Sequence, residues 1–181
     1  CLYGLLLHSA NDCANALAEY VAGSNSAFAE MMNEKAKEIG CTDSHFTNPS
    51  GLNNNEHYCS AMDMAKIMQY AIKNPVFLQI DATQAYTHAP IIKYPDAGAK
   101  ENTIYAHHKM MRKSYREYYE GVFAGKTGYT MLAGNTLLTA CKRGDTTLIC
   151  AILNGHNSQY RDTKKLFDFG FSQFVSYPVE K

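Results

Sequence analysis

The 181-residue sequence has no net charge, no long hydrophobic run and no basic segment at its beginning. Its 17 basic residues balance its 17 acidic ones, so no overall field would attract nucleic acid or an anionic membrane. The longest apolar run, near Leu5-Leu6-Leu7, is too short to span a bilayer, and the beginning does not resemble a signal peptide. The length and the ordinary hydrophobic content predict one globular domain with its own core.

Metal-binding patterns are also missing. None of the seven histidines stands in His-Glu-x-x-His spacing, and the six cysteines form no Cys-x-x-Cys pair. We therefore expect no metal and no cofactor, and we expect the pair His107-His108 to be solvated. The cysteines are widely spaced in a domain that is not small, which favours free and mostly buried thiols.

Hydrophobic periodicity and capping residues predict helices in the first half of the chain. These helices should cover residues 2–8, 11–21, 27–39, 60–72 and 75–80, and glycines at 23 and 40 should end the second and third. Ser60 and Asn74-Pro75 are typical starts for the last two. Apolar stripes predict the inward side chains, which are Cys13, Ala16, Leu17 and Tyr20 in the second helix and Phe28, Met31, Met32 and Ala36 in the third.

The second half of the sequence favours strands. Short β-prone runs lie in residues 82–94 and 102–106, and stronger candidates cover 122–129, 135–142 and 146–153. Arg143-Gly144-Asp145 would form a compact turn between the last two. An amphipathic helix at 159–174, with Leu166, Phe167 and Phe171 inward, can pack on the sheet. This order predicts helices, then an antiparallel meander, then a closing helix.

Two short polar motifs, Ser9-Ala10-Asn11 and Lys126-Thr127-Gly128, carry the chemistry of the sequence. Each has an ordinary interpretation, because Ser9 could cap a helix and the second motif could end a strand in a tight turn. Glycine weakens a strand unless another group must approach its backbone closely. A strand that pairs with a peptide needs such access, and Lys126 with Thr127 offers a cation and a hydroxyl to a carboxylate.

The setting of both motifs resembles the low-molecular-mass penicillin-binding proteins, the serine-type D-alanyl-D-alanine carboxypeptidases of peptidase family S11. The resemblance covers almost the whole chain in order, and it is specific. Its segments are residues 5–18, 27–33, Gly40, His45-Phe46, Asn48-Pro49-Ser50-Gly51-Leu52, 57–65, Gly125-Lys126-Thr127-Gly128-Tyr129-Thr130, Ala133-Gly134, Arg161-Asp162 and 166–171. It implies the serine β-lactamase/transpeptidase-like fold, a mixed α+β fold with an antiparallel sheet flanked by helices and a helical lobe beside it.

The sequence departs from this family at several places. The family's nucleophile lies in a Ser-x-x-Lys motif upstream of Ser-x-Asn, and no Ser-x-x-Lys occurs in these residues. We therefore expect an N-terminally truncated catalytic domain at residues 1–175, with 176–181 beginning a linker to an absent C-terminal domain. Such a fragment should be inactive alone, and a second chain, a swapped segment or residues left out of this sequence would complete the fold. Between Ala106 and Gly121 the family usually has an asparagine-containing stretch, where this chain has His107-His108-Lys109-Met110-Met111-Arg112, so no substrate contact is carried over there.

The resemblance implies two-step acyl transfer, in which a serine attacks the carbonyl between two D-alanines and water later frees the shortened peptide. Ser9 would relay a proton, and the Asn11 amide would hold the substrate's backbone or its acyl side chain. Lys126 would polarise Ser9 and attract the terminal carboxylate, which Thr127 would bind. The Tyr129 N–H would supply half of the oxyanion hole, and Gly128 and Thr130 complete the substrate-binding strand.

Rival functions remain open. A β-lactamase or a transpeptidase would share the fold, and a non-catalytic peptidoglycan-binding module would share the surface. The expected partners are a peptidoglycan stem peptide ending in D-Ala-D-Ala and β-lactam antibiotics, which need the missing serine for covalent binding; nucleic acid is not expected. The resemblance also implies an extracytoplasmic location in the cell envelope, where this substrate lies.

Overall fold

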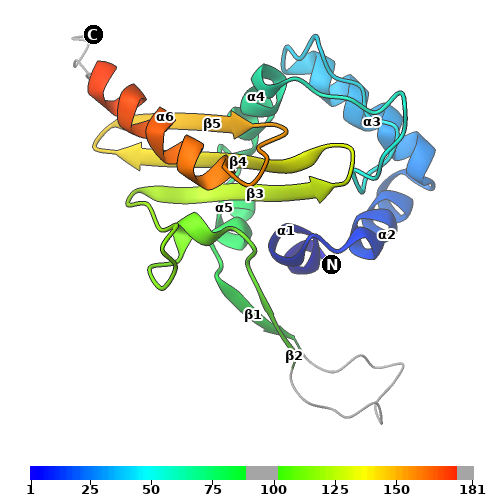
Figure 1. Cartoon of the computed structure of the whole chain (residues 1–181). Helices are drawn as coiled ribbons and strands as arrows, with labels where there is room; N and C mark the ends of the chain where they lie inside the picture. Colours follow the sequence, from blue (N-terminus) through cyan, green and yellow to red (C-terminus); the bar gives the residue numbers. More distant parts are fainter. Residues whose placement is uncertain (89–101, 175–181) are drawn as a thin grey trace, which may run out of the picture.

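A computed structural model describes residues 1–88 and 102–174 (Figure 1). At its centre is a three-stranded antiparallel sheet in the order β3-β4-β5, made by β3 (Val122–Thr130), β4 (Gly134–Arg143) and β5 (Thr146–Ile152). Helix α6 (Gln159–Gln173) packs against β4 and β5 from one side. Helices α4 (Ala61–Ala71) and α5 (Pro75–Asp81) cover the other side (Figure 1). The chain is a mixed α+β protein with an antiparallel sheet flanked by helices, as predicted.

The remaining helices lie beside the C-terminal end of β3. They are α1 (Leu2–His8), α2 (Asn11–Ala22) and α3 (Asn25–Glu38), and α1 also contacts α5 (Figure 1). Strands β1 (Ala85–His88) and β2 (Asn102–Tyr105) form a separate antiparallel ribbon. A 3₁₀ turn, η1 (Lys109–Met111), follows β2 and contacts β3. The helices thus place the start of the chain next to a strand two thirds of the way along it.

Local capping explains most of the helix boundaries. The Ser24 hydroxyl accepts from Ala27 N–H, and the Ser60 hydroxyl accepts from Asp63 N–H. Asn74 Oδ1 accepts from two N–H groups of α5, whose first residue is proline. Gly40 follows α3 with φ 84°, a conformation that side chains with a Cβ rarely adopt. These residues give the expected helices nearly the predicted bounds.

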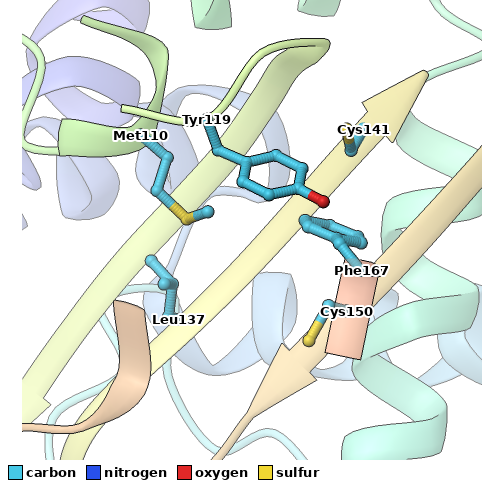
Figure 2. Close-up of a cluster of buried hydrophobic side chains, with 6 residues drawn as sticks. All are labelled: Met110, Tyr119, Leu137, Cys141, Cys150 and Phe167. Atoms are coloured by element: carbon cyan, nitrogen blue, oxygen red, sulfur yellow. The ribbon is translucent and has the colours of Figure 1, made fainter. Parts of the chain in front are cut away.

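The two faces of the sheet bury different clusters because side chains alternate along β4. Leu137 faces α6 and packs with Phe167, Tyr119, Met110, Cys141 and Cys150. Figure 2 shows Phe167 between the side chains of Tyr119 and Cys150. Leu138 faces the opposite side and packs with Met68 of α4 and with Ala124 and Ala140. Both faces of the sheet are therefore held by helices.

The predicted inward stripes of α2, α3 and α6 are partly wrong. In α2 the buried residues are Ala14 and Ala18, while Ala16 and Tyr20 are exposed. In α3 they are Ala29 and Ala36, and Met31 is exposed. Helices α2 and α3 contact one another, and the residues that they bury are small alanines, while the larger Tyr20 and Met31 side chains are exposed. In α6 Phe167 is buried and Phe171 packs against the same cluster, but Leu166 is half exposed.

All six cysteines lie in the described ranges, and all are free thiols. Only Cys141 and Cys150 are buried, because they sit on the central strand and its neighbour under α6, so the expectation of mostly buried thiols is wrong. Across residues 1–88 and 102–174, no helix is both long enough and apolar enough to cross a membrane. The β-prone Ile91-Ile92 and the predicted linker at 176–181 lie outside the described residues, and the domain boundary stays a prediction.

Candidate active site

Ser9 is the C-cap residue of α1, and its hydroxyl does not cap the helix that follows. Its φ of 57° and ψ of 38° lie in the left-handed region, and its N–H donates to Leu5 O at 3.2 Å. The N-cap of α2 is Ala10, and no side chain caps that helix. The Ser9 hydroxyl is therefore not used as a helix cap, contrary to its ordinary interpretation.

Lys126, on β3, reaches the Ser9 hydroxyl although the two residues are 117 positions apart. Lys126 Nζ donates to Ser9 Oγ and also to Thr127 O, the latter at 2.8 Å. Burial lowers the pKa of the Lys126 ammonium, and the nearby Asp81 carboxylate opposes part of this effect. The result is a cation whose hydrogen bonds orient it toward a hydroxyl, a suitable arrangement for proton relay and for anion binding.

A carboxylate that sequence analysis missed lies near Lys126 and affects its pKa. Asp81, the last residue of α5, is 3% exposed, and its Oδ2 accepts from Gly125 N–H at 2.6 Å. Burial raises the pKa of Asp81 to about 6, although the Gly125 hydrogen bond and the Lys126 charge pull it down. Asp81 thus fixes the backbone immediately before Lys126. No local motif marks it, because the contact joins positions 44 apart.

His108 is the second missed residue, and its location corrects the expectation of a solvated pair. Its side chain is buried behind β3, with Nε2 at 2.9 Å from Thr139 Oγ1, whereas His107 is exposed. Burial lowers the pKa of His108 to about 4, so the imidazole is neutral at physiological pH. A Cβ on Gly125 would lie 2.6 Å from His108 Cδ2 and 2.6 Å from Leu138 O. The absence of a side chain at Gly125 therefore makes room for the His108 imidazole.

The backbone of β3 leaves one edge open at the motif. β4 pairs with β3 from Ala124 to Thr130 without a break in register, and no strand among residues 1–88 and 102–174 pairs with the opposite edge. Because Gly125 N–H points away from β4 toward Asp81, the N–H groups of Thr127 and Tyr129 point the same way. Asp81 closes this edge at Gly125, and the edge is free for a ligand from Thr127 onward.

All seven predicted site residues line one cleft of about 1090 Å³. They are Ser9, Asn11, Lys126, Thr127, Gly128, Tyr129 and Thr130. Tyr129 is 68% exposed, while the hydroxyl of Thr130 donates to Asn53 Oδ1 at 2.9 Å and accepts from Ala133 N–H at 3.0 Å. Thr130 thus joins the strand to the loop that forms the opposite wall. The structure brings the predicted residues together, and their individual roles stay predictions.

Residues 50–53 and 57–59 form the opposite wall, where Tyr58 pairs with His45, and a buried carboxylate holds the two residues before His45. Asp63 of α4 accepts from Asp43 N–H at 2.7 Å and Ser44 Oγ at 2.9 Å, and it pairs with Lys66 at 3.2 Å. Burial alone would raise the pKa of Asp63, but these hydrogen bonds outweigh it and lower the pKa to about 2. The Asp63 carboxylate is therefore ionised at neutral pH, and its hydrogen bonds hold the loop before α4 in place.

Comparisons with known proteins agree with this geometry. A family model described as D-alanyl-D-alanine carboxypeptidase, peptidase S11, matches residues 1–157. The chain is 32% identical to D-alanyl-D-alanine carboxypeptidase DacF of Bacillus subtilis over 99% of its own length and 44% of the relative. It is 34% identical to DacB2 of Mycobacterium tuberculosis, covering 94% of this chain and 57% of that protein. The chain therefore spans about half the length of these relatives.

Solved structures give the same result for the fold. A penicillin-binding protein homologue from Mycobacterium tuberculosis matches with a TM-score of 0.83 at 33% identity, covering 99% of this chain and 66% of that one. A mutant of the Streptomyces K15 DD-transpeptidase matches with a TM-score of 0.84 at 29% identity, over 94% of this chain and 66% of that one. The helices and the sheet therefore have the arrangement found in DD-peptidases.

Proposed function

Because the chain belongs to the D-alanyl-D-alanine carboxypeptidase family, peptidase S11, we propose that it forms the substrate-binding side of a serine D-alanyl-D-alanine carboxypeptidase. The substrate would be a peptidoglycan stem peptide ending in D-Ala-D-Ala, and the place of action would be the cell envelope, outside the cytoplasmic membrane. The nucleophilic serine would come from a Ser-x-x-Lys segment that these 181 residues do not contain.

The observation that carries this proposal is the contact of Lys126 Nζ with Ser9 Oγ inside the cleft. A hydroxyl can accept and donate a proton in the same step, so Ser9 can pass one between a catalytic lysine and the leaving amine. Lys126, half-buried and next to Thr127, can attract the carboxylate of the terminal D-alanine. Ser9 and Lys126 can therefore act together on the terminal D-alanine, Ser9 on its leaving amine and Lys126 on its carboxylate.

The open edge of β3 supports the rest of the mechanism. An extended peptide could pair with the free backbone from Thr127 to Tyr129, as peptides do at sheet edges. The Tyr129 N–H, which points away from β4, would then donate to the oxygen of the attacked carbonyl; one such donor is typically worth about 3 kcal/mol of barrier. Asn11, exposed at the start of α2 in the same cleft, would hold the acyl side of the peptide.

Release of D-alanine from a pentapeptide tests this function. The assay uses a longer polypeptide in which the same residues follow a Ser-x-x-Lys segment, together with its Lys126→Ala and Lys142→Ala variants. Lys142 is an exposed lysine on β4 and serves as the matched control. We expect Lys126→Ala to remove most of the activity and Lys142→Ala to retain it. Wild-type rates in Lys126→Ala would contradict the assigned site, and no release by the parent would favour a non-catalytic peptidoglycan-binding module.

A second candidate is transfer of the acyl group to an amine instead of water. The similarity to a structure named as a DD-transpeptidase favours it, at a TM-score of 0.84. Addition of an amine acceptor to the same assay separates the two reactions, because transfer gives a lengthened peptide and hydrolysis gives a free carboxylate.

A further inference from the structure

The cleft continues past Lys126 into a cationic and aromatic region that the proposed mechanism does not use. Lys109 and Arg112 line it together with Tyr105, Tyr115 and Tyr160. We call these five residues the Lys109–Arg112 subsite. Lys109 opens the η1 turn and Arg112 follows it, and the two methionines between them are buried. The turn is thereby anchored, and both cations sit at the cleft.

Aromatic faces hold the two cations without neutralising them. Arg112 lies 4.8 Å from the centre of the Tyr115 ring and 5.5 Å from that of Tyr105. Lys109 lies 5.8 Å from the Tyr115 ring and 6.0 Å from the Tyr160 ring. Arg112 Nη1 also donates to Tyr115 Oη at 3.5 Å. Such contacts restrict the cations while leaving their other N–H donors available to an anion.

Among residues 1–88 and 102–174, neither Lys109 nor Arg112 forms an ion pair. Glu117 is near enough for Lys109 to contribute to the lowering of its pKa, after the larger effect of Arg116. The Glu117 carboxylate, however, is paired with Arg116 at 2.9 Å. The positive charge of the subsite is therefore available to a ligand.

The subsite adjoins the proposed catalytic groups. The ring of His107 lies 4.8 Å from that of His8, the neighbour of Ser9, and Tyr160 Oη donates to His107 O at 3.4 Å. Burial, His8 and Lys126 all lower the pKa of His107, which indicates that Lys126 is close to it. His107 thus connects the Ser9–Lys126 pair to the Lys109–Arg112 subsite.

The direction of the bound peptide decides which part of a reactant reaches this subsite. In the proposed function the attacked carbonyl lies at Tyr129 N–H and the terminal carboxylate at Thr127 and Lys126. A line from Tyr129 through Lys126 continues toward Val122, the first residue of β3. The segment just before β3 is bonded to η1, because Tyr119 N–H donates to Met110 O at 3.1 Å. Asp81 occupies the strand edge at Gly125, so a reactant group that extends beyond Lys126 cannot pair with the backbone there. Such a group would contact side chains of the cleft. The subsite therefore lies on the leaving-group side.

Resting on the proposed function and on its second candidate, transfer of the acyl group to an amine, we propose that the Lys109–Arg112 subsite binds the second carboxylate of an amine acceptor, an α-amino acid or peptide with an acidic side chain. The acceptor amine takes the position of the departed D-alanine amine, with its α-carboxylate at Lys126 and Thr127. The nitrogen attacks the acyl-serine carbonyl, so that a C–N bond forms and the ester C–O bond breaks. One amine proton passes through the Ser9 hydroxyl to the serine oxygen. The cleft thus selects acidic acceptors for acyl transfer.

D-Glutamate and D-glutamine are the probes, since they share size and α-carboxylate and differ in side-chain charge. Each is titrated into the ¹⁵N-labelled 181-residue chain at matched ionic strength, with binding followed by NMR. We expect both to shift the Thr127 amide signal and D-glutamate to bind about fivefold more tightly, an advantage that salt weakens. The double variant Lys109→Gln/Arg112→Gln should lose this preference. Lys113→Gln, an exposed neighbour outside the cleft, should keep it.

The outcomes separate the two proposals. Equal affinities of the wild-type chain for both probes, or an unchanged preference in a double variant that keeps its thermal transition, would overturn the subsite and leave the proposed function standing. If the double variant loses its fold, the single variant Arg112→Gln replaces it, with a weaker preference expected. Absence of binding by both probes would contradict the α-carboxylate site and the subsite together. In the longer polypeptide, equal transfer to the two acceptors would also overturn the proposal.

Discussion

Replacement of Asp81 by asparagine should stabilise the fold at neutral pH and have little effect in acid. Asparagine keeps the volume and an oxygen acceptor for Gly125 N–H, but it removes a buried negative charge. Burial raises the pKa of Asp81 from its ordinary 3.8 to about 6. The two pKa values differ by about two units, and each unit corresponds to about 1.36 kcal/mol. The ionised carboxylate therefore lowers the free energy of unfolding by up to about 3 kcal/mol at pH 7.5. The stability contributed by protonated Asp81 is complete below pH 3.8 and is lost as the pH rises through about 6.

Urea unfolding at pH 4.0 and 7.5 measures this effect on wild type, Asp81→Asn and Asp145→Asn. Asp145 lies exposed in the β4–β5 turn, so its variant should stay within about 0.5 kcal/mol of wild type at both pH values. Asp81→Asn should exceed wild type by up to about 3 kcal/mol at pH 7.5 and match it within about 0.5 kcal/mol at pH 4.0. The pKa of Lys126 should fall further in this variant, because the supporting carboxylate is gone. Lower stability of Asp81→Asn at pH 7.5 would refute the reasoning.

Three further predictions concern the strand, the core and the chemistry. Gly125→Ala should destabilise the chain by about 1–3 kcal/mol or more, because the added Cβ would meet His108 and a backbone oxygen. Gly128→Ala should cost less, because only a threonine side chain is near that position. Chemical denaturation measures both variants, and equal losses of stability would contradict this prediction. Phe167→Ala should lose about 3–5 kcal/mol, since that ring is 1% exposed, and Phe169→Ala, 64% exposed, should change little in the same measurement. The 181-residue chain should form no covalent adduct with a fluorescent penicillin on a denaturing gel, and a labelled band would show that another nucleophile is present.

Local signals were sufficient for the elements of the fold. Ser24, Ser60 and Asn74-Pro75 mark helix starts through bonds to N–H groups two or three residues away, so their signal lies in the local sequence. The alternation of strand residues and the Arg143-Gly144-Asp145 turn likewise predict the hairpin of β4 and β5. The Ser-x-Asn and Lys-Thr-Gly motifs predict the lining of the cleft because they carry the polar groups that the chemistry requires.

What the sequence could not predict depends on contacts between distant segments. Nothing near Asp81 marks it as the partner of Gly125, and nothing near His108 marks it as buried under Thr139. Periodicity favoured Tyr20 as an inward residue of α2, but the residues that this helix buries are Ala14 and Ala18. Only the packing of one element on another decides which of two plausible faces is buried.

The central claim is that the Ser9–Lys126 end of the cleft binds the carboxylate of a D-Ala-D-Ala terminus. Its most direct test is an NMR titration of the ¹⁵N-labelled chain with an N-acylated peptide ending in D-Ala-D-Ala, alongside the same peptide with a C-terminal amide and the L-Ala-L-Ala peptide. We predict saturable shifts of the Ser9, Thr127 and Tyr129 amide signals with the D,D-peptide acid alone, lost in Lys126→Gln. Equal binding of all three peptides, or shifts confined to another surface, would contradict the claim.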